Sequence, residues 1–332
     1  MKDKIKRILI GISTIILIIF MIFYVDIREI LKNLNKISLL GIFLFILIYT
    51  TTFILRSIKL KQVFHGLNLK SSLLILYGSY GIGFAINELT PGKFGELARI
   101  EYIQQKEKDI SLTRSVCGVS IERFIDLLVL FLFISLVTIY LYLNNFKGTS
   151  NLNLHIYLGI GALFLSGAVV ILILLFLISD WILNIIGKIS SKLERKLKQF
   201  LEGFLNGVNE FRKNKKSVIK VIILSFPTWF LDTLTLVLLF YLIGYEINIF
   251  IIIMAQIIVF FTKAFPITPG GWVISESVGA LLIFLFYPSI PYNIILSIFI
   301  LDHLIRSAYI FVYGVFSSVG FNFKFEKMIK QI

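Results

Sequence analysis

The chain has 332 residues, of which 58% are hydrophobic and 16% charged, and its mean hydropathy is +0.91. This composition excludes a soluble domain, in which about a quarter of the residues are charged. Together with apolar runs of 18 or more residues, it predicts an all-α polytopic integral membrane protein. The net charge of +14 lies mostly between the apolar runs, where basic residues face anionic lipid, so no nucleic-acid partner is expected.

The N-terminal segment is basic and is followed by an apolar run over residues 8–25. This run is too long for the apolar core of a signal peptide, and no small-x-small cleavage site follows it. We interpret it as the first membrane helix, with the N-terminus in the cytoplasm.

Five further apolar runs predict full spans over 37–55, 116–143, 154–178, 217–243 and 293–319. With the first run, this makes six full spans. The basic clusters between the spans then fall on one side of the membrane, including Arg56, Lys59, Lys61 and Lys70 at the end of the second run. By the positive-inside rule, we expect a multi-pass protein of the cell membrane with both termini cytoplasmic.

Two shorter apolar segments, 72–89 and 249–265, each lead to a Thr-Pro-Gly sequence, at 90–92 and 268–270. A helix broken there leaves backbone N–H and C=O groups unpaired, and lipid cannot satisfy them. The breaks must therefore be buried in protein or line a wet cavity. We predict two broken hairpins, continued by helices near 94–106 and 273–287, whose breaks form one central site.

The same series occurs in two halves, 37–143 and 217–319: a span, a broken hairpin and a long span with charged residues. In the predicted topology the first hairpin enters from inside and the second from outside. This predicts an inverted repeat in a single transmembrane domain over 1–332, with a substrate site near the midplane.

Between the halves, residues 188–213 carry apolar side chains at steps of three and four, and the opposite face is rich in lysine and arginine. This pattern predicts an amphipathic cytoplasmic helix. It can lie in the inner membrane interface or pack on the cytoplasmic ends of the bundle, and the two interpretations are compatible.

The chemistry expected at the breaks is anion binding. A helix that begins after a break directs free N–H groups and a positive dipole end at the gap, and lysine and arginine side chains add formal charge. A phosphate headgroup is the natural occupant. The candidate substrate-binding residues are Thr90, Pro91, Gly92, Lys93, Gly95, Glu96, Arg99, Glu122, Arg123, Asp126, Lys263, Pro269, Gly270, Gly271, Glu276, Asp302 and Arg306.

Charged residues inside apolar spans either pair with one another or serve a transport pathway. For Asp302 and Arg306, one helical turn apart, we favour a pair that locks the bundle. For Glu96, Arg99 and Glu276, each beside a backbone break, we favour a functional role. Asp232 stands alone in its span, and capping a neighbouring helix and a role in transport both remain open.

Two common enzyme motifs are absent from the sequence. There is no His-Glu-x-x-His zinc motif and no phosphate-binding Gly-x-x-x-x-Gly-Lys-Ser/Thr loop. The three histidines have no metal-ligand spacing, and the single cysteine, Cys117, excludes an intramolecular disulfide. We therefore expect no catalytic activity, no metal and no cofactor.

Three groups of residues resemble a known family: Thr90-Pro91-Gly92-Lys93-Phe94-Gly95-Glu96 with Arg99, Glu122-Arg123 with Asp126, and Pro269-Gly270-Gly271 with Glu276. They are similar to the flippase-like membrane domain of lysylphosphatidylglycerol synthases, and the resemblance covers nearly the whole chain. It implies movement of a lipid between leaflets. The soluble synthase domain that follows in those enzymes is not found here, so the resemblance implies no aminoacyl transfer. The family often has glycine where this chain has Val273.

We therefore expect a protein that translocates an anionic lipid or a polyprenyl-phosphate-linked lipid between leaflets. The headgroup is held at the two broken hairpins and the tails stay in the surrounding membrane lipid. Two alternatives remain: an intramembrane enzyme that acts on a lipid phosphate, and a non-catalytic scaffold of a lipid-modifying complex.

Overall fold

The computed structural model describes residues 27–90, 94–144, 191–263 and 268–320, and these form helices without any strand. Four described helices are long and apolar enough to cross a membrane: α3 (Leu39–Gly66), α6 (Leu112–Leu143), α9 (Lys215–Ile243) and α12 (Tyr292–Gly320). They correspond to four of the six expected spans. The spans expected at 8–25 and 154–178 lie outside the described residues.

Shorter helices complete the described part of the chain. The helices expected after the two breaks are present as α5 and α11. The shorter elements are α2 (Ile27–Leu34), α4 (Leu73–Leu89), α5 (Gly95–Lys106), α8 (Ser191–Lys213), α10 (Ile249–Thr262), the 3-10 turn η1 (Pro269–Gly271) and α11 (Ile274–Phe286).

The sequence sets several helix starts through short polar side chains, which accept a hydrogen bond from an otherwise unpaired N–H group of the first turn. Ser38 accepts from the Gly41 N–H at 3.1 Å before α3, and Asn214 accepts from the Ser217 N–H at 3.2 Å before α9. At the other end of α9, Gly244 adopts a φ of 100°, a conformation that glycine reaches without steric cost.

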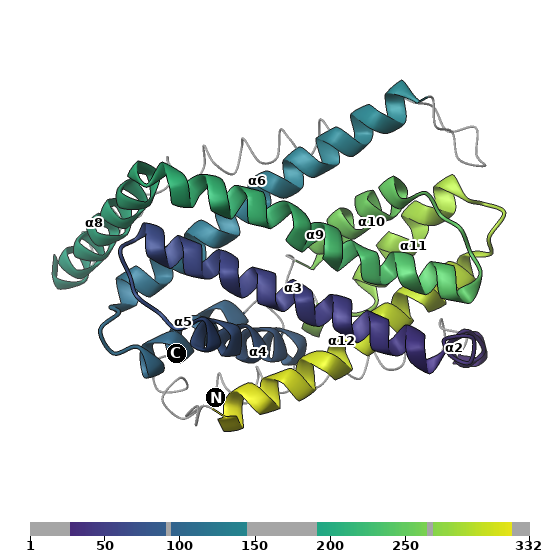
Figure 1. Cartoon of the computed structure of the whole chain (residues 1–332), viewed down its shortest axis with the longest axis horizontal. Helices are drawn as coiled ribbons and strands as arrows, with labels where there is room; N and C mark the ends of the chain where they lie inside the picture. Colours follow the sequence, from purple (N-terminus) through teal and green to yellow (C-terminus); the bar gives the residue numbers. More distant parts are fainter. Residues whose placement is uncertain (1–26, 91–93, 145–190, 264–267, 321–332) are drawn as a thin grey trace.

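Helices α3 and α9 run side by side through the length of the bundle (Figure 1). α4 contacts α3, α5 and α12, and α10 contacts α9, α11 and α6. α12 contacts α9 and α11, and α6 contacts α3 and α5. One large apolar core joins these helices, and a smaller apolar cluster lies between α4 and α5. Exposed side chains such as Leu39, Leu143 and Phe316 cover the outer faces. An apolar exterior of this kind is suited to lipid and indicates a membrane protein.

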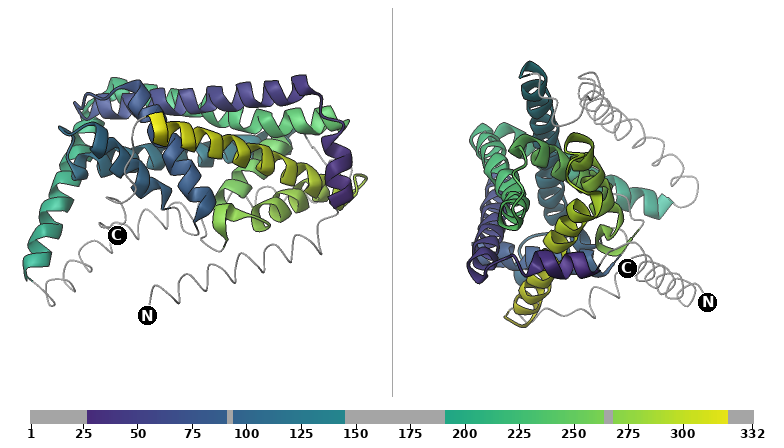
Figure 2. Two further views of the ribbon diagram at one scale, coloured as in Figure 1. Left: turned by 90° about the horizontal axis from the view of Figure 1, so that it is seen from below. Right: turned by 90° about the vertical axis from the view of Figure 1, so that its right-hand side faces the viewer.

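Helix α8 extends away from the bundle (Figure 2) and covers much of the segment where the amphipathic helix is expected. Its C-terminal part contacts α6, α9 and α3. A Cβ at Gly207 would lie 2.7 Å from Cys117 Sγ, and Glu210 pairs with Arg114 at 2.6 Å. The end of α8 is thus packed on the bundle.

One sequence interpretation is wrong: Arg56 and Lys59 do not belong to a basic cluster at the end of a span. α3 continues to Gly66, and Arg56 and Lys59 are 3% and 0% exposed within it. Both side chains pair with carboxylates on neighbouring helices, which keeps two charges inside an apolar bundle.

Helices α4 and α12 approach each other closely through glycine. A Cβ at Gly314 would lie 2.5 Å from the Cβ of Ala85, and a Cβ at Gly81 would lie 2.3 Å from Ser317 Oγ. Small residues are common where membrane helices pack closely, because they let the backbones come together. This contact places the end of α4 against the middle of α12, where the charged residues lie.

We expect Gly314→Ala to lower the free energy of unfolding by about 1–3 kcal/mol, because the added methyl group has no space beside Ala85. The matched control is Gly320→Ala on the same helix, where a Cβ meets nothing within 4 Å. Thermal unfolding of the purified proteins in detergent measures the difference. Equal melting temperatures for the two variants would contradict the close α4–α12 packing.

Candidate functional site

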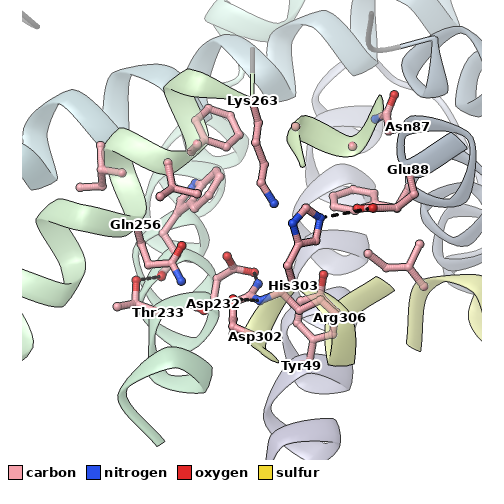
Figure 3. Close-up of a pocket in the computed structure, with 18 of the residues that line it drawn as sticks. Tyr49, Asn87, Glu88, Asp232, Thr233, Gln256, Lys263, Asp302, His303 and Arg306 are labelled. Atoms are coloured by element: carbon pink, nitrogen blue, oxygen red, sulfur yellow. Dashed lines mark hydrogen bonds and ion pairs between the residues drawn. The ribbon is translucent and has the colours of Figure 1, made fainter. Parts of the chain in front are cut away.

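A cavity of about 150 Å³ lies inside the bundle, where the end of α4 meets η1 (Figure 3). Its lining comes from α3, α4, α5, α6, α9, α10, η1, α11 and α12. Many of the lining side chains are charged: Arg56, Glu88, Glu96, Arg123, Asp232, Lys263, Glu276, Asp302, His303 and Arg306. The cavity therefore combines charged and apolar side chains inside an apolar bundle.

The second break is a tight turn packed against other helices. Gly270 and Gly271 have φ values of 61° and 81°. A Cβ at Gly270 would lie 2.7 Å from Glu88 Oε2, and one at Gly271 would lie 2.7 Å from Lys263 Cγ. The two glycines thus permit both the positive φ values and the close contact with α4 and with the end of α10.

Val273 completes this turn with a φ of 73° and a ψ of −50°. A β-branched residue rarely adopts a positive φ, and such a conformation costs about 1–3 kcal/mol. Val273 therefore holds a backbone conformation that glycine would adopt without strain.

At the first break, Pro91, Gly92 and Lys93 lie outside the described residues. Thr90 lines the cavity and donates to the Ile86 carbonyl at 2.6 Å. Asn87, which the sequence analysis did not single out, accepts from the Gly95 N–H at 2.8 Å.

Acidic side chains stand at both helix starts, and the first N–H group of α5 already has a partner. The Gly95 N–H is already bonded to Asn87, and the first turns of α5 and α11 carry Glu96 and Glu276. A carboxylate in the first turn complements the positive end of its own helix. These carboxylates compete with an external anion at both helix starts.

Arg99 is fully buried and contacts protein carboxylates. Its guanidinium donates to Glu96 Oε2 at 2.8 Å and to Glu122 Oε2 at 2.9 Å, and it lies 3.9 Å from the Tyr80 ring centroid. The Tyr80 hydroxyl donates to Glu122 as well. These contacts join α4, α5 and α6, and Arg99 does not line the cavity.

Lys59 from α3 completes this group. Its ammonium lies 2.5 Å from Asp126 Oδ1 and 3.5 Å from Glu122 Oε1. Arg123 pairs with Glu96 at 3.1 Å, and these two side chains face the cavity. The α5–α6 cluster therefore consists of three cations (Lys59, Arg99 and Arg123) and three carboxylates (Glu96, Glu122 and Asp126).

The expected pair between Asp302 and Arg306 is present at 2.8 Å. Arg306 also lies 3.2 Å from Asp232, which in turn lies 3.4 Å from Arg56. The sequence indicated no partner for Asp232, but in the structure it forms ion pairs with two arginines from two other helices. This second cluster ties α3, α9 and α12 together.

The third group centres on His303, which is 2% exposed. Its Nδ1 contacts Glu276 Oε1, and its Nε2 lies 3.3 Å from Glu88 Oε2. The Trp272 ring stacks on the imidazole with centroids 4.0 Å apart and an angle of 8° between the planes. His303 and Glu88 were not among the candidate residues. One sequence signal could have indicated His303: it directly follows the acid Asp302, just as Arg123 directly follows the acid Glu122 in the other predicted half.

Lys263 differs from the other cavity cations. Among the residues that the structure describes, its ammonium has no ion-pair partner, whereas Arg56, Arg123 and Arg306 each pair with a carboxylate. Figure 3 shows its side chain extending into the cavity toward His303. Gln256, on the same helix, also lines the cavity, and its Nε2 is buried without a hydrogen-bond partner.

Comparison with protein families identifies the family of the chain. The family described as the lysylphosphatidylglycerol synthase TM region matches residues 8–314. The chain belongs to this family. No curated protein and no solved structure matches the chain. Membership indicates a lipid-related role in a membrane, and the charged cavity lies within the matched region.

We expect Glu122→Gln to destabilise the protein by about 3–5 kcal/mol, because it leaves the buried α5–α6 cluster with one more cation than carboxylates. Glu246→Gln, at an exposed position, is the control and should unfold like the wild type. Chemical or thermal unfolding in detergent provides the comparison. A Glu122→Gln protein as stable as the control would show that the α5–α6 cluster does not hold the bundle.

We expect Val273→Gly to raise the free energy of unfolding by about 1 kcal/mol, since glycine adopts the positive φ without strain. Val278→Gly, inside α11, is the matched control and should lower stability, because glycine weakens a helix interior. Melting temperatures of the two variants against the wild type test this. A loss of stability in both would indicate that the Val273 side chain contributes more than its backbone conformation costs.

Proposed function

We propose that this protein moves an anionic lipid, or a polyprenyl-phosphate-linked lipid, between the two leaflets of the cell membrane. The observation that carries the proposal is the Lys263 ammonium, which has no carboxylate partner among the described residues and extends into a cavity between the two breaks. Family membership supports a lipid as the ligand.

The headgroup occupies the central cavity in this proposal. Its phosphate contacts the Lys263 ammonium and the free Gln256 Nε2, both of which line the cavity from the α10 side. A hydrogen bond between an ammonium and a phosphate is about twice as strong as one between neutral groups. The acyl or prenyl tails remain in the lipid beside the bundle, so only the headgroup enters the polar interior.

The other charged candidates have supporting roles. Arg99, Glu122 and Asp126 hold helices together, while Arg123 and Glu96 form a paired wall of the cavity. Asp302 and Arg306 form a second paired part of the cavity lining. Replacing any of these residues breaks an ion pair of the bundle, whereas Lys263 can be replaced without breaking an ion pair among the described residues.

The helix order supports an inverted repeat over 37–143 and 217–319. The series α3, α4, α5, α6 and the series α9, α10, α11, α12 each consist of a long helix, two short helices and a long helix. Arg56 and Asp232 each lie 17 residues after the first residue of their helix, Leu39 and Lys215, and pair with each other. In transporters, movement of one such half against the other exposes a midplane site to each side in turn. The positive-inside rule then favours cytoplasmic termini for this arrangement.

A leaflet-exchange assay tests the proposal. The protein is reconstituted in vesicles of phosphatidylethanolamine and phosphatidylglycerol with a trace of fluorescent phosphatidylglycerol, and dithionite bleaches the label in the outer leaflet. We expect Lys263→Gln to slow exchange roughly tenfold or more, because a charge-assisted hydrogen bond contributes about 1.5–3 kcal/mol. Lys263→Arg should retain most of the exchange, and the exposed Lys220→Gln should behave as wild type.

Each other outcome identifies a different function. Exchange at the wild-type rate in Lys263→Gln would remove Lys263 from the site. Chemical conversion of the labelled lipid, read by thin-layer chromatography of the same vesicles, would favour an intramembrane enzyme. If neither labelled phosphatidylglycerol nor a labelled polyprenyl phosphate moves or is converted, the scaffold alternative is favoured.

A further inference from the structure

The group around His303 holds more acceptors than a neutral imidazole can satisfy. Both ring nitrogens face carboxylate oxygens, Nδ1 toward Glu276 Oε1 and Nε2 toward Glu88 Oε2. A neutral imidazole has one N–H donor and one acceptor nitrogen, and an ionised carboxylate only accepts. With both carboxylates ionised and His303 neutral, one ring lone pair would be directed at a carboxylate oxygen.

One additional proton removes this conflict. It can reside on the imidazole, which then donates to both carboxylates, or on one carboxyl group, which then donates to the neutral ring. His303 and Glu276 are buried, at 2% and 3% exposure, and the ring nitrogens contact the carboxylate oxygens directly, so no water stands between them to supply the missing donor. The Glu276 Oε2 atom is also buried without a hydrogen-bond partner.

The η1 turn connects this group to the cavity cation. Gly270 packs against Glu88, Gly271 packs against Lys263, and Trp272 stacks on His303. These three consecutive residues therefore contact a carboxylate, the lysine and the imidazole at the same time. A change of charge on any of them acts on the same short, strained turn.

We propose that His303, Glu276 and Glu88 form a proton-binding site whose occupancy is coupled to binding of the anionic headgroup at Lys263. The headgroup half of this statement rests on the function proposed above. The proton half rests on the geometry of the three side chains alone.

The coupling follows from charge. With the extra proton, His303, Glu276 and Glu88 together carry one negative charge, and without it they carry two. The Lys263 ammonium faces this group, so the deprotonated group attracts it more strongly and competes with a phosphate for it. Proton binding therefore makes Lys263 available to the headgroup, and by reciprocity the headgroup favours proton binding. The protein then moves a proton together with an anionic lipid.

Other charged groups near His303 already have partners. Asp302 and Arg306 on α12 pair with each other, Arg306 also pairs with Asp232 of α9, and Asp232 pairs with Arg56 of α3. Ser307 donates to Glu88 Oε2 at 3.0 Å, and Ser275 Oγ lies 2.7 Å from Glu276 Oε1. These neutral hydroxyls orient the carboxylates but do not change the charge of the group.

The stacked Trp272 provides a direct optical probe, because protonation of an imidazole in contact with an indole ring quenches its fluorescence. The chain has three tryptophans, so replacing Trp181 and Trp229 with phenylalanine leaves Trp272 as the reporter. We expect the emission of this protein in detergent to change in one step between about pH 4 and pH 9. The step should be lost in His303→Gln and retained in His65→Gln, a histidine bonded to Ser217 away from the cavity.

A second variant guards against misfolding of His303→Gln. Glu88→Gln, near the end of α4, supplies an amide that can donate to or accept from the neutral ring, so it should also abolish or displace the step. A pH-independent emission in the parent protein, or a step that survives His303→Gln, would overturn the proton site.

The coupling is tested in the vesicles described above by imposing a pH difference across the membrane. We expect a roughly fivefold or larger change in the exchange rate of fluorescent phosphatidylglycerol, within the usual range of coupling between two sites, and no response in Glu88→Gln. Exchange that continues without any dependence on the pH difference overturns the coupling and leaves the proposed function in place. A fluorescence step without lipid exchange overturns the lipid function and leaves only the proton site.

Discussion

Lipid cannot hydrogen-bond to a charged side chain or to a broken helix end, and this constraint organises the bundle. Lys59, Arg99 and Arg306 are each directed at carboxylates on other helices. The ion pairs therefore decide which helices lie together, while the apolar faces supply most of the contact area. A buried pair does not by itself add stability, but removing one partner is costly. The charged clusters thus act mainly by specifying one arrangement of the helices.

Two groups in the cavity lack the full set of partners that the other buried charges have. Lys263 has no carboxylate partner among the described residues, and His303 faces two carboxylates with only one donor in its neutral form. Both meet at a turn in which Val273 has a positive φ. Unsatisfied groups and strained backbone often gather at functional sites, where a ligand supplies what the protein lacks. A phosphate at Lys263 and a proton at His303 would each complete the local set of partners.

The sequence was informative where the signal is local. Apolar runs predicted the four described spans, and Thr-Pro-Gly marked both breaks together with the short helices α5 and α11 that follow them. One-turn spacing predicted the Asp302–Arg306 pair, and the motifs beside the breaks indicated the correct family. Val273 was recognised as unusual from a family resemblance, and its positive φ gives the physical reason.

By itself, then, the sequence determined that this is a helical membrane protein of the lysylphosphatidylglycerol synthase TM family with two interrupted helices, because hydropathy and helix breaking act over a few neighbouring residues. Only the tertiary structure decided how each charge is used. Lys59 reaches Asp126 across 67 residues of chain, and His303 reaches Glu88 across 215. Such pairings depend on how the helices cross, which no local pattern records. The same crossings bury Arg99 among carboxylates and leave Lys263 extending into the cavity.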